Sequence, residues 1–202
     1  MKVVIISSSY RRNGGTKLVI NKFIEGMKSS NPNCNVKEIE LLQANIEYCK
    51  GCMACINDKS ELIGECILKD GMKDILDECI SSDILVFASP IYEGYVTSIM
   101  KKFMERTLCL HKLEKGRPKA RIAPNKNKKG VILLVSGVPY PINVIVGITK
   151  AAKKSMKILM KAFGIKNPTI FLAGDIVGNE NNKKKYSQKA FELGQSIILK
   201  NK

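Results

Sequence analysis

The sequence predicts a three-layer α/β domain, in which a five-stranded parallel sheet carries helices on both faces. Five short β-branched runs alternate with longer segments whose apolar residues recur at helical spacing. Alternation of this kind, with short connections, produces parallel strands joined by right-handed crossovers. The 202 residues suffice for one sizeable domain and are too few for two ordinary ones. We therefore expect a single domain over residues 1–202.

Four of the five expected strands are almost wholly apolar, which is typical of parallel strands covered on both faces. The second, NVKEIEL, alternates apolar and charged residues, and this pattern is typical of an edge strand. Five strands in about 200 residues suit the flavodoxin-like three-layer sandwich, with strand order 2-1-3-4-5. The expected strands are 2–7, 35–41, 84–89, 130–136 and 168–174.

Helices are expected between the strands. Residues 15–29 carry an apolar stripe at helical spacing, and Gly164 is a natural stop for the helix that precedes it. The expected helices are 15–29, 71–81, 97–110, 143–163 and about 183–200. Two long stretches show no regular pattern: a cysteine-rich insertion at about 43–70 and a basic segment at about 111–129. A loop that long inside a compact domain is usually functional or mobile.

The formal net charge of +16 makes phosphate-bearing ligands, nucleic acids and anionic membranes plausible partners. The basic clusters do not interleave aromatic residues, so we expect no nucleic-acid binding. No apolar run approaches a membrane span, and the N-terminal MKVVIISSS reads as a first strand rather than a signal peptide, so we expect a cytoplasmic protein. The segment 111–129 is either a mobile arm or a surface that packs on a neighbouring subunit.

The loop after the first strand, SSSYRRNGGTKLV, is typical of a phosphate site. Its glycines let backbone N–H groups point inward, and its hydroxyls and the following helix N-terminus favour phosphate oxygens. It lacks the Gly-Lys-Ser/Thr ending of an ATP loop and the G-x-G-x-x-G spacing, which favours a mononucleotide phosphate. The alternative is an ordinary strand-to-helix turn in which Thr16 is only a cap.

The loop after the third strand begins at ASPIYEGYVTS. Pro90 and Gly94 are expected to bracket an exposed turn that contains Ile91, Tyr92 and Glu93. Such a turn can place backbone N–H groups and a flat side chain against a planar ligand. The alternative is a plain connection with Tyr92 packed on the next helix.

These segments resemble signatures of the NADPH-dependent FMN reductase family. Residues 9–16 look like its phosphate loop, residues 89–106 look like its Ser-Pro-Val-Tyr-Phe-Gly motif and following helix, and residues 66–72 look like the segment between them. Tyr10, Gly15 and Glu93 depart from the usual proline, asparagine and apolar residue. The resemblance implies that FMN is bound by Ser9, Arg11, Asn13, Gly15 and Thr16 at the phosphate, by Pro90, Ile91, Tyr92, Glu93 and Gly94 along the isoalloxazine, and by Ser136 and Gly137 on its other side.

The resemblance further implies an oxidoreductase that takes hydride from NAD(P)H and reduces a quinone, a flavin or a nitro compound. No catalytic side chain is expected, because the cofactor carries the chemistry. The family implies a homodimer or homotetramer. The alternative function is an iron–sulfur flavoprotein that exchanges electrons with a ferredoxin-like partner.

The cysteine-rich insertion decides between these two functions. Cys49, Cys52 and Cys55 have the C-x₂-C-x₂-C spacing of iron–sulfur ligands, and Cys66 follows after ten residues, a longer gap than the iron–sulfur flavoproteins show. The four thiols are expected either to bind a [4Fe-4S] cluster or to stay free of metal, with zinc or a disulfide as further alternatives. The other three cysteines, Cys34, Cys79 and Cys109, read as packing residues. His111 is the single histidine, which excludes His-rich metal sites.

Overall fold

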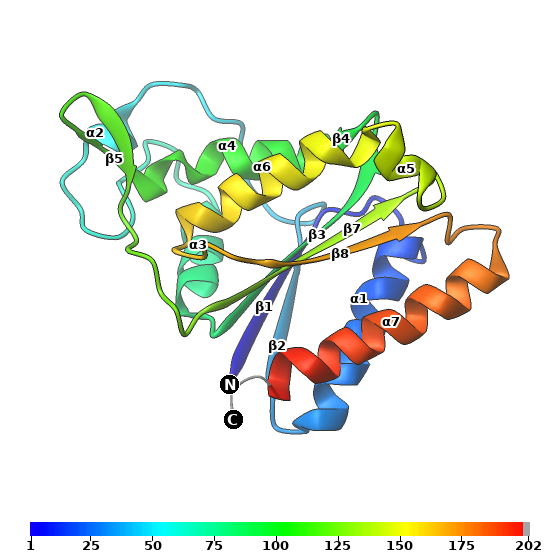
Figure 1. The fold of residues 1–202 in the computed structure, drawn as a ribbon. Coiled ribbons are helices and arrows are strands. Elements are labelled where there is room, and N and C mark those ends of the chain that lie inside the picture. Colours follow the sequence, from blue (N-terminus) through cyan, green and yellow to red (C-terminus); the bar gives the residue numbers. More distant parts are fainter. Residues whose placement is uncertain (200–202) are drawn as a thin grey trace.

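The central layer is a sheet with the strand order β2-β1-β3-β7-β8. The four pairs of neighbouring strands in this order are all parallel. The computed structural model describes residues 1–199 (Figure 1). The expected strand order is confirmed, and the five expected strands all form. They are β1 (Lys2–Ser7), β2 (Asn35–Glu40), β3 (Ile84–Tyr92), β7 (Lys129–Ser136) and β8 (Thr169–Gly174).

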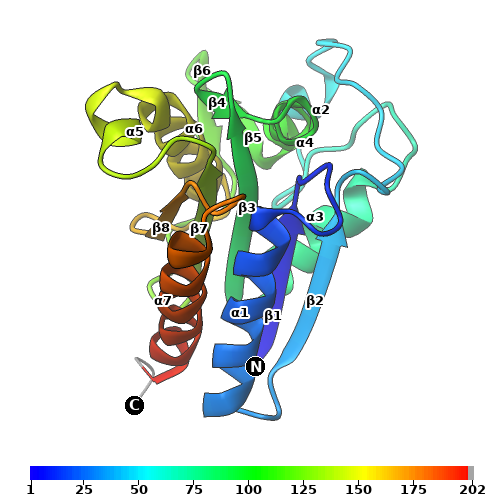
Figure 2. The ribbon, with the colours of Figure 1, turned by 90° about the vertical axis from the view of Figure 1, so that its right-hand side faces the viewer.

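Helices cover both faces of this sheet. α1 (Gly15–Ser30) and α7 (Glu180–Leu199) lie against one face, and α3 (Met72–Ser81), α4 (Ser98–Arg106) and α6 (Ile148–Ala162) lie against the other (Figures 1 and 2). Alternate residues of β1 point to opposite faces, so Val3 belongs to the core under α1 and Val4 to the core under α3, α4 and α6. Because both faces are covered, the apolar runs of the central strands are fully buried.

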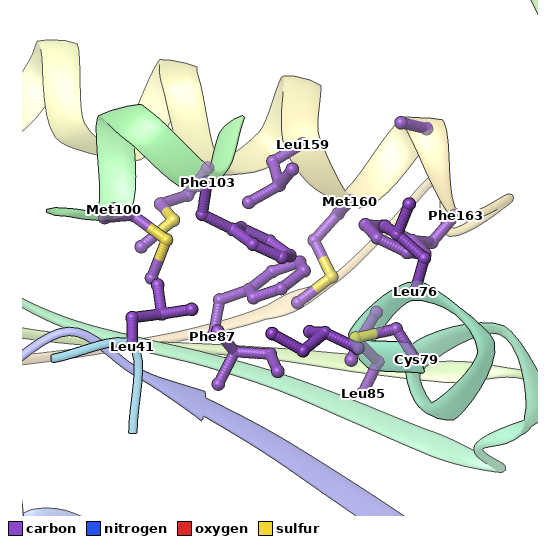
Figure 3. Close-up of a cluster of buried hydrophobic side chains, with 14 of the residues drawn as sticks. Leu41, Leu76, Cys79, Leu85, Phe87, Met100, Phe103, Leu159, Met160 and Phe163 are labelled. Atoms are coloured by element: carbon purple, nitrogen blue, oxygen red, sulfur yellow. The ribbon is translucent and has the colours of Figure 1, made fainter. Parts of the chain in front are cut away.

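The core on the α3–α4–α6 side is built around aromatic side chains. Phe87 of β3 lies 6.1 Å from Phe103 of α4 and 5.7 Å from Phe163, measured between ring centroids, in tilted arrangements (Figure 3). Cys79 and Met160 fill the space beside these rings. This core fixes α4 on β3, and α4 begins beside the loop that follows β3.

Two expected helices differ in detail from the structure. The α-helical part of the segment 97–110 ends at Arg106 and continues as a 3₁₀-helix, η1 (Thr107–Leu110). The segment 143–163 is divided into α5 (Ile142–Ile145) and α6, because Gly147 adopts a φ of +75° at the N-cap of α6. The last helix begins earlier than expected, and its expected end at residue 200 lies outside the described residues.

The expectation of an irregular segment over 111–129 is wrong for its first half. β5 (His111–Glu114) and β6 (Arg117–Ala120) form an antiparallel hairpin. Lys115 and Gly116 make its two-residue turn with φ values of +52° and +75°. The two strands are polar and mostly exposed, so the sequence has no alternation of apolar and polar residues that would predict them. The cysteine-rich insertion is largely irregular, as expected, and contains one short helix, α2 (Ala54–Asn57).

α1 and α7 cross at two glycines. A Cβ added to Gly26 would lie 1.9 Å from the Phe191 carbonyl oxygen, and one added to Gly194 would lie 2.1 Å from the Phe23 carbonyl oxygen. Both obstacles are backbone atoms, so a methyl group can enter only if the helices separate. Within residues 1–199, no helix combines the length and the apolar character that a membrane crossing requires.

Gly194→Ala is therefore expected to lower the free energy of unfolding by about 1–3 kcal/mol, the usual cost of overpacking. Chemical denaturation followed by circular dichroism measures this loss. Lys189→Ala, on the exposed face of the same helix, is the matched control and should change stability by about 0.5 kcal/mol or less. Equal effects of the two substitutions would contradict the close helix contact.

Candidate functional site

The loops after β1, β3 and β7 meet at the carboxyl edge of the sheet, because these strands are adjacent and parallel. The Ser8 N–H donates to the Ala88 carbonyl at 3.0 Å, so the first loop continues the pairing of β1 with β3. Thr97, at the N-cap of α4, donates to the Ser8 carbonyl at 3.2 Å and accepts from the Met100 N–H. These bonds fix the start of α4 against the first loop. In open α/β sheets, ligands bind at this edge.

The first loop turns sharply before α1. The Ser9 hydroxyl donates to the Arg11 carbonyl at 3.1 Å and accepts from the Arg11 N–H at 3.3 Å. Gly14 is the N-cap residue of α1. Within residues 14–18, no side chain forms a capping hydrogen bond to α1, and no acidic residue lies in the first turn of the helix. Thr16 is buried and does not occupy the cap position. The end of α1 therefore offers backbone N–H groups and the positive end of the helix dipole to an anion.

Arg11 lies beside this helix end. A Cβ added to Gly14 would come within 3.1 Å of the Arg11 Cβ and 3.7 Å of its Cδ, so the arginine stem packs beside the N-cap residue. Asn13 is exposed and Gly15 is half-buried beside it. An arginine beside an uncapped helix N-terminus supplies donors that fit a phosphate monoester.

Tyr10 stands where the family usually has proline, and it joins the first and third loops. Its ring stacks on Tyr92 with a centroid distance of 6.2 Å and an interplanar angle of 6°. Its hydroxyl is 2.6 Å from the Ser98 Oγ. Both rings are partly exposed, so the carboxyl edge presents a flat aromatic surface beside the phosphate loop.

The turn expected at 90–94 is shorter than the sequence suggested. Pro90 and Ile91 still belong to β3, pair with β7 and are buried. β4 (Tyr95–Val96) pairs back on β3, and the turn between them consists of Glu93 and Gly94 with φ values of +48° and +77°. The expectation of an exposed turn is therefore wrong for Ile91, which is buried in β3, and holds for Tyr92 and Glu93, which are exposed.

β7 ends at Ser136, and the following loop completes the edge. The Ser136 hydroxyl accepts from the Val138 N–H at 3.1 Å and is buried. Gly137 is exposed, and a Cβ added there would meet nothing within 4 Å. The loop continues into α5, where Ile142 and Ile145 are 50% and 77% exposed. The candidate flavin residues thus lie on three adjacent loops of one edge.

The cysteine-rich insertion is folded so that Cys66 returns toward Cys55. The Gly64 N–H donates to the Cys109 carbonyl at 2.8 Å, and a Cβ on Gly64 would lie 1.9 Å from the Cys55 carbonyl oxygen. Arg121 donates to the carbonyls of Cys55 and Asp58 and holds the loop closed. The ten-residue gap therefore loops out between the two cysteines.

The four thiols nevertheless do not form a ready metal site. Cys52 is exposed, Cys49 and Cys66 are half-buried, and Cys55 is buried. Burial, followed by the neighbouring thiols, raises the pKa of Cys55 above its usual value. Among residues 1–199, no three Cys, His, Asp or Glu side chains are arranged to hold a metal ion. The residues as they stand do not fit a cluster.

The remaining cysteines are packing residues, as expected. Cys34, Cys79 and Cys109 are buried, and burial raises the pKa of Cys79 and of Cys109 to about 12. The thiols of Cys79 and Cys109 are therefore held in their neutral form.

Arg106, the last residue of α4, has contacts that its position in the sequence does not predict. Its guanidinium donates to both carboxylate oxygens of Asp70, at 2.5 Å and 2.9 Å, and to the Glu47 carbonyl at 2.8 Å. Its Nη2 lies 3.8 Å from the Cys66 Sγ. The two charged side chains are only 2% and 5% exposed. One ion pair thus joins α4 to both ends of the cysteine-rich insertion.

This ion pair makes stability dependent on pH in the acid range. The hydrogen bonds from Arg106 lower the pKa of Asp70 from 3.8 to about 2. Because the folded pKa is depressed, the stabilisation is present above pH 3.8 and is lost as the pH falls toward 2. The loss amounts to about 2 kcal/mol.

Urea denaturation across that pH range measures the loss. Asp70→Asn should flatten the pH dependence by about this amount. Asp74→Asn, an exposed residue in the first turn of α3, should leave the wild-type slope in place. A slope unchanged by Asp70→Asn would contradict the assignment.

Comparison with known proteins agrees with this geometry. A family model described as NADPH-dependent FMN reductase matches residues 1–164. Relatives named iron–sulfur flavoprotein occur in Clostridioides difficile (strain 630), Archaeoglobus fulgidus and Methanocaldococcus jannaschii, with 27%, 31% and 29% identity. The alignments cover 64%, 54% and 64% of this chain. They cover 56%, 46% and 64% of the relatives, so the chain spans about half to two thirds of their length.

Solved structures share the fold. An NAD(P)H:quinone oxidoreductase from Methanothermobacter marburgensis superposes with a TM-score of 0.74 at 18% identity, covering 98% of this chain and 96% of that one. An FMN-dependent NADH-azoreductase from Bacillus anthracis, in complex with FMN, gives 0.74 at 16% identity, covering 98% and 100%. At such identities the likeness shows the fold alone. Because the family model spans residues 1–164 and the signature loops converge at one edge, this chain belongs to the NADPH-dependent FMN reductase family.

Proposed function

We propose that this protein is an FMN-dependent oxidoreductase that accepts hydride from NAD(P)H and reduces a small acceptor such as a quinone, a flavin or a nitro compound. The observation that carries the proposal is the uncapped N-terminus of α1 with Arg11 packed beside it. This donor set suits the phosphate of a mononucleotide, and it lies at the edge where flavodoxin-like sheets bind their ligands.

In this proposal, residues of the three loops hold the flavin. The phosphate set is Ser9, Arg11, Asn13, Gly15 and Thr16; the isoalloxazine set is Pro90, Ile91, Tyr92, Glu93, Gly94, Ser136 and Gly137. Bound FMN supplies hydride and electron transfer. The protein supplies orientation and charge, and the exposed Glu93 carboxylate beside the ring disfavours acidic acceptors.

The proposal extends to assembly and location. The exposed apolar side chains of α5 lie next to the flavin edge, which supports the homodimer or homotetramer implied by the family. All seven cysteines are free thiols, which suits the reducing cytoplasm. Size-exclusion chromatography with light scattering tests the assembly: a monomer at working concentrations would contradict it.

The activity is tested on FMN-loaded protein under anaerobic conditions. Addition of NADPH or NADH should bleach the flavin absorbance, and a quinone or nitro acceptor should restore it in repeated cycles. If the protein binds FMN but neither nucleotide bleaches the flavin absorbance, the proposed hydride donor is contradicted. The proposal of FMN binding would still stand.

A second candidate is an iron–sulfur flavoprotein with a ferredoxin-like partner. Its support is the name of the relatives and the closed loop that returns Cys66 to Cys55. The four thiols lie near one another, but within residues 1–199 no three of them are arranged to hold a metal ion, which weighs against it. Iron and acid-labile sulfide assayed on anaerobically purified protein decide the matter. Stoichiometric iron and sulfide would establish the cluster, and a flavin spectrum without either would exclude it.

A further inference from the structure

A surface cavity lies toward the amino ends of β7 and β8, at the opposite edge of the sheet from the flavin loops. It has a volume of about 770 Å³, within the range of small-molecule sites. It is an open groove lined by the β5–β6 hairpin, the segment that follows β6 and the end of α6. Its lining residues are Lys112, Lys119, Ala120, Arg121, Ile122, Ala123, Pro124, Lys161, Gly164, Lys166 and Asn167.

The walls of this cavity are fixed by backbone contacts. Gly164 ends α6 with a φ of +76°, and a Cβ there would lie 2.5 Å from the Ala123 carbonyl oxygen. The Asn125 N–H donates to the Gly164 carbonyl at 3.0 Å. The Arg121 N–H donates to the Leu110 carbonyl at 2.8 Å, which holds the same segment to the hairpin base. The cavity therefore belongs to the folded chain and not to a loose arm.

The charge of the lining is one-sided. Five of its eleven residues are Lys or Arg, and none is Asp or Glu. Glu114 of β5 pairs with Lys119 and also interacts with Lys112. Within residues 1–199, Lys161 and Lys166 form no ion pair with a carboxylate. Two exposed lysines therefore line the cavity without a counter-ion from the protein.

The cavity also has an apolar side. Ile122, Ala123 and Pro124 are consecutive in the chain and form an apolar stretch of its wall. A ligand that satisfies both parts carries several negative charges and a hydrophobic or planar group. Phosphorylated small molecules with a base or ring have this composition.

The location separates this cavity from the proposed flavin site. Its residues precede β7 and β8, whereas the flavin loops follow β1, β3 and β7. β8 has six residues and β7 has eight, so the two edges are roughly 20 Å apart at the rise of an extended strand. A nicotinamide bound at this cavity could not reach a flavin at the other edge.

We propose that this cavity is a second anion site, which binds a phosphorylated small molecule of about nucleotide size independently of FMN. The ammonium groups of Lys161 and Lys166 contact its phosphates, and the Ile122–Pro124 wall contacts its apolar group. The site requires no covalent step and no conformational change.

The test uses ADP as the probe, titrated into full-length protein by calorimetry in the presence of excess FMN and physiological salt. Wild-type protein should bind ADP saturably with one site per chain. The double substitution Lys161→Gln/Lys166→Gln should weaken binding roughly tenfold or more, because two charge-assisted contacts are lost.

The matched control is Lys150→Gln/Lys154→Gln, which removes two exposed lysines of α6 that lie outside the cavity. It should weaken ADP binding less than about threefold, the size of a screened long-range charge effect. Absence of saturable ADP binding would overturn the proposal, as would equal weakening in both double variants. Competition between ADP and FMN would also overturn it, because the probe would then occupy the flavin edge. Salt-sensitive binding of a DNA oligonucleotide in place of ADP would overturn it in favour of a nucleic-acid surface.

Discussion

Replacing Arg106 by methionine is expected to lower the free energy of unfolding by about 3–5 kcal/mol, the cost of breaking a buried ion pair from one side. The substitution leaves the Asp70 carboxylate charged in a site where its side chain is 5% exposed. It also removes the donor to the Glu47 carbonyl, so the start of the cysteine-rich insertion loses one of its ties to α4, while Lys102 still donates to the Ile46 carbonyl. Urea denaturation at neutral pH measures the effect.

Two further variants separate charge burial from simple loss of packing. Arg106→Met combined with Asp70→Leu removes both charges and should recover most of the loss, since a buried pair can be replaced by apolar side chains at little cost. Lys101→Met breaks the exposed ion pair with Glu105 on the same helix and should cost about 0.5 kcal/mol or less. If Arg106→Met cost no more than Lys101→Met, the buried pair would not anchor the insertion.

Replacing Arg11 by alanine is expected to weaken FMN binding by roughly 10- to 100-fold. A hydrogen bond from a charged donor contributes about 1.5–3 kcal/mol, and about 1.4 kcal/mol corresponds to a tenfold change in Kd. Arg11 packs beside the N-terminus of α1, where the phosphate is proposed to bind. Quenching of FMN fluorescence during titration of protein into FMN measures Kd directly.

The adjacent Arg12 supplies the control for this prediction. It is exposed, carries the same charge and lies in the same loop, so Arg12→Ala tests the effect of net charge alone. A loss of about threefold or less is expected from that variant. Equal losses from the two substitutions would show that the loop attracts FMN by its overall charge and that Arg11 has no specific contact.

The central sheet could be predicted from the sequence because its strands are buried on both faces. Val3, Val86 and Leu133 belong to continuous apolar runs, and such runs have few alternatives in a chain of this length. The β5–β6 hairpin could not be predicted in this way. Its residues are polar, and only the Lys115–Gly116 turn marks it.

The position of the functional loops could be predicted, because each follows a predicted strand. The side-chain contacts within and between these loops could not. The sequence placed Tyr10 in the phosphate loop but did not show that its ring stacks on Tyr92, which is distant in the chain. Arg106 and Asp70 are 36 residues apart, and the charged residue at the end of an amphipathic helix gave no sign of burial. Such pairs depend on how α4 packs beside the insertion, and residue spacing does not encode that.

Equilibrium titration of the purified protein with FMN tests the central claim most directly. The account predicts saturable binding of one FMN per chain, weakened by Arg11→Ala and nearly unchanged by Arg12→Ala. Failure of the folded wild-type protein to bind FMN, at concentrations where it stays soluble, would contradict the assignment of the carboxyl edge as a flavin site.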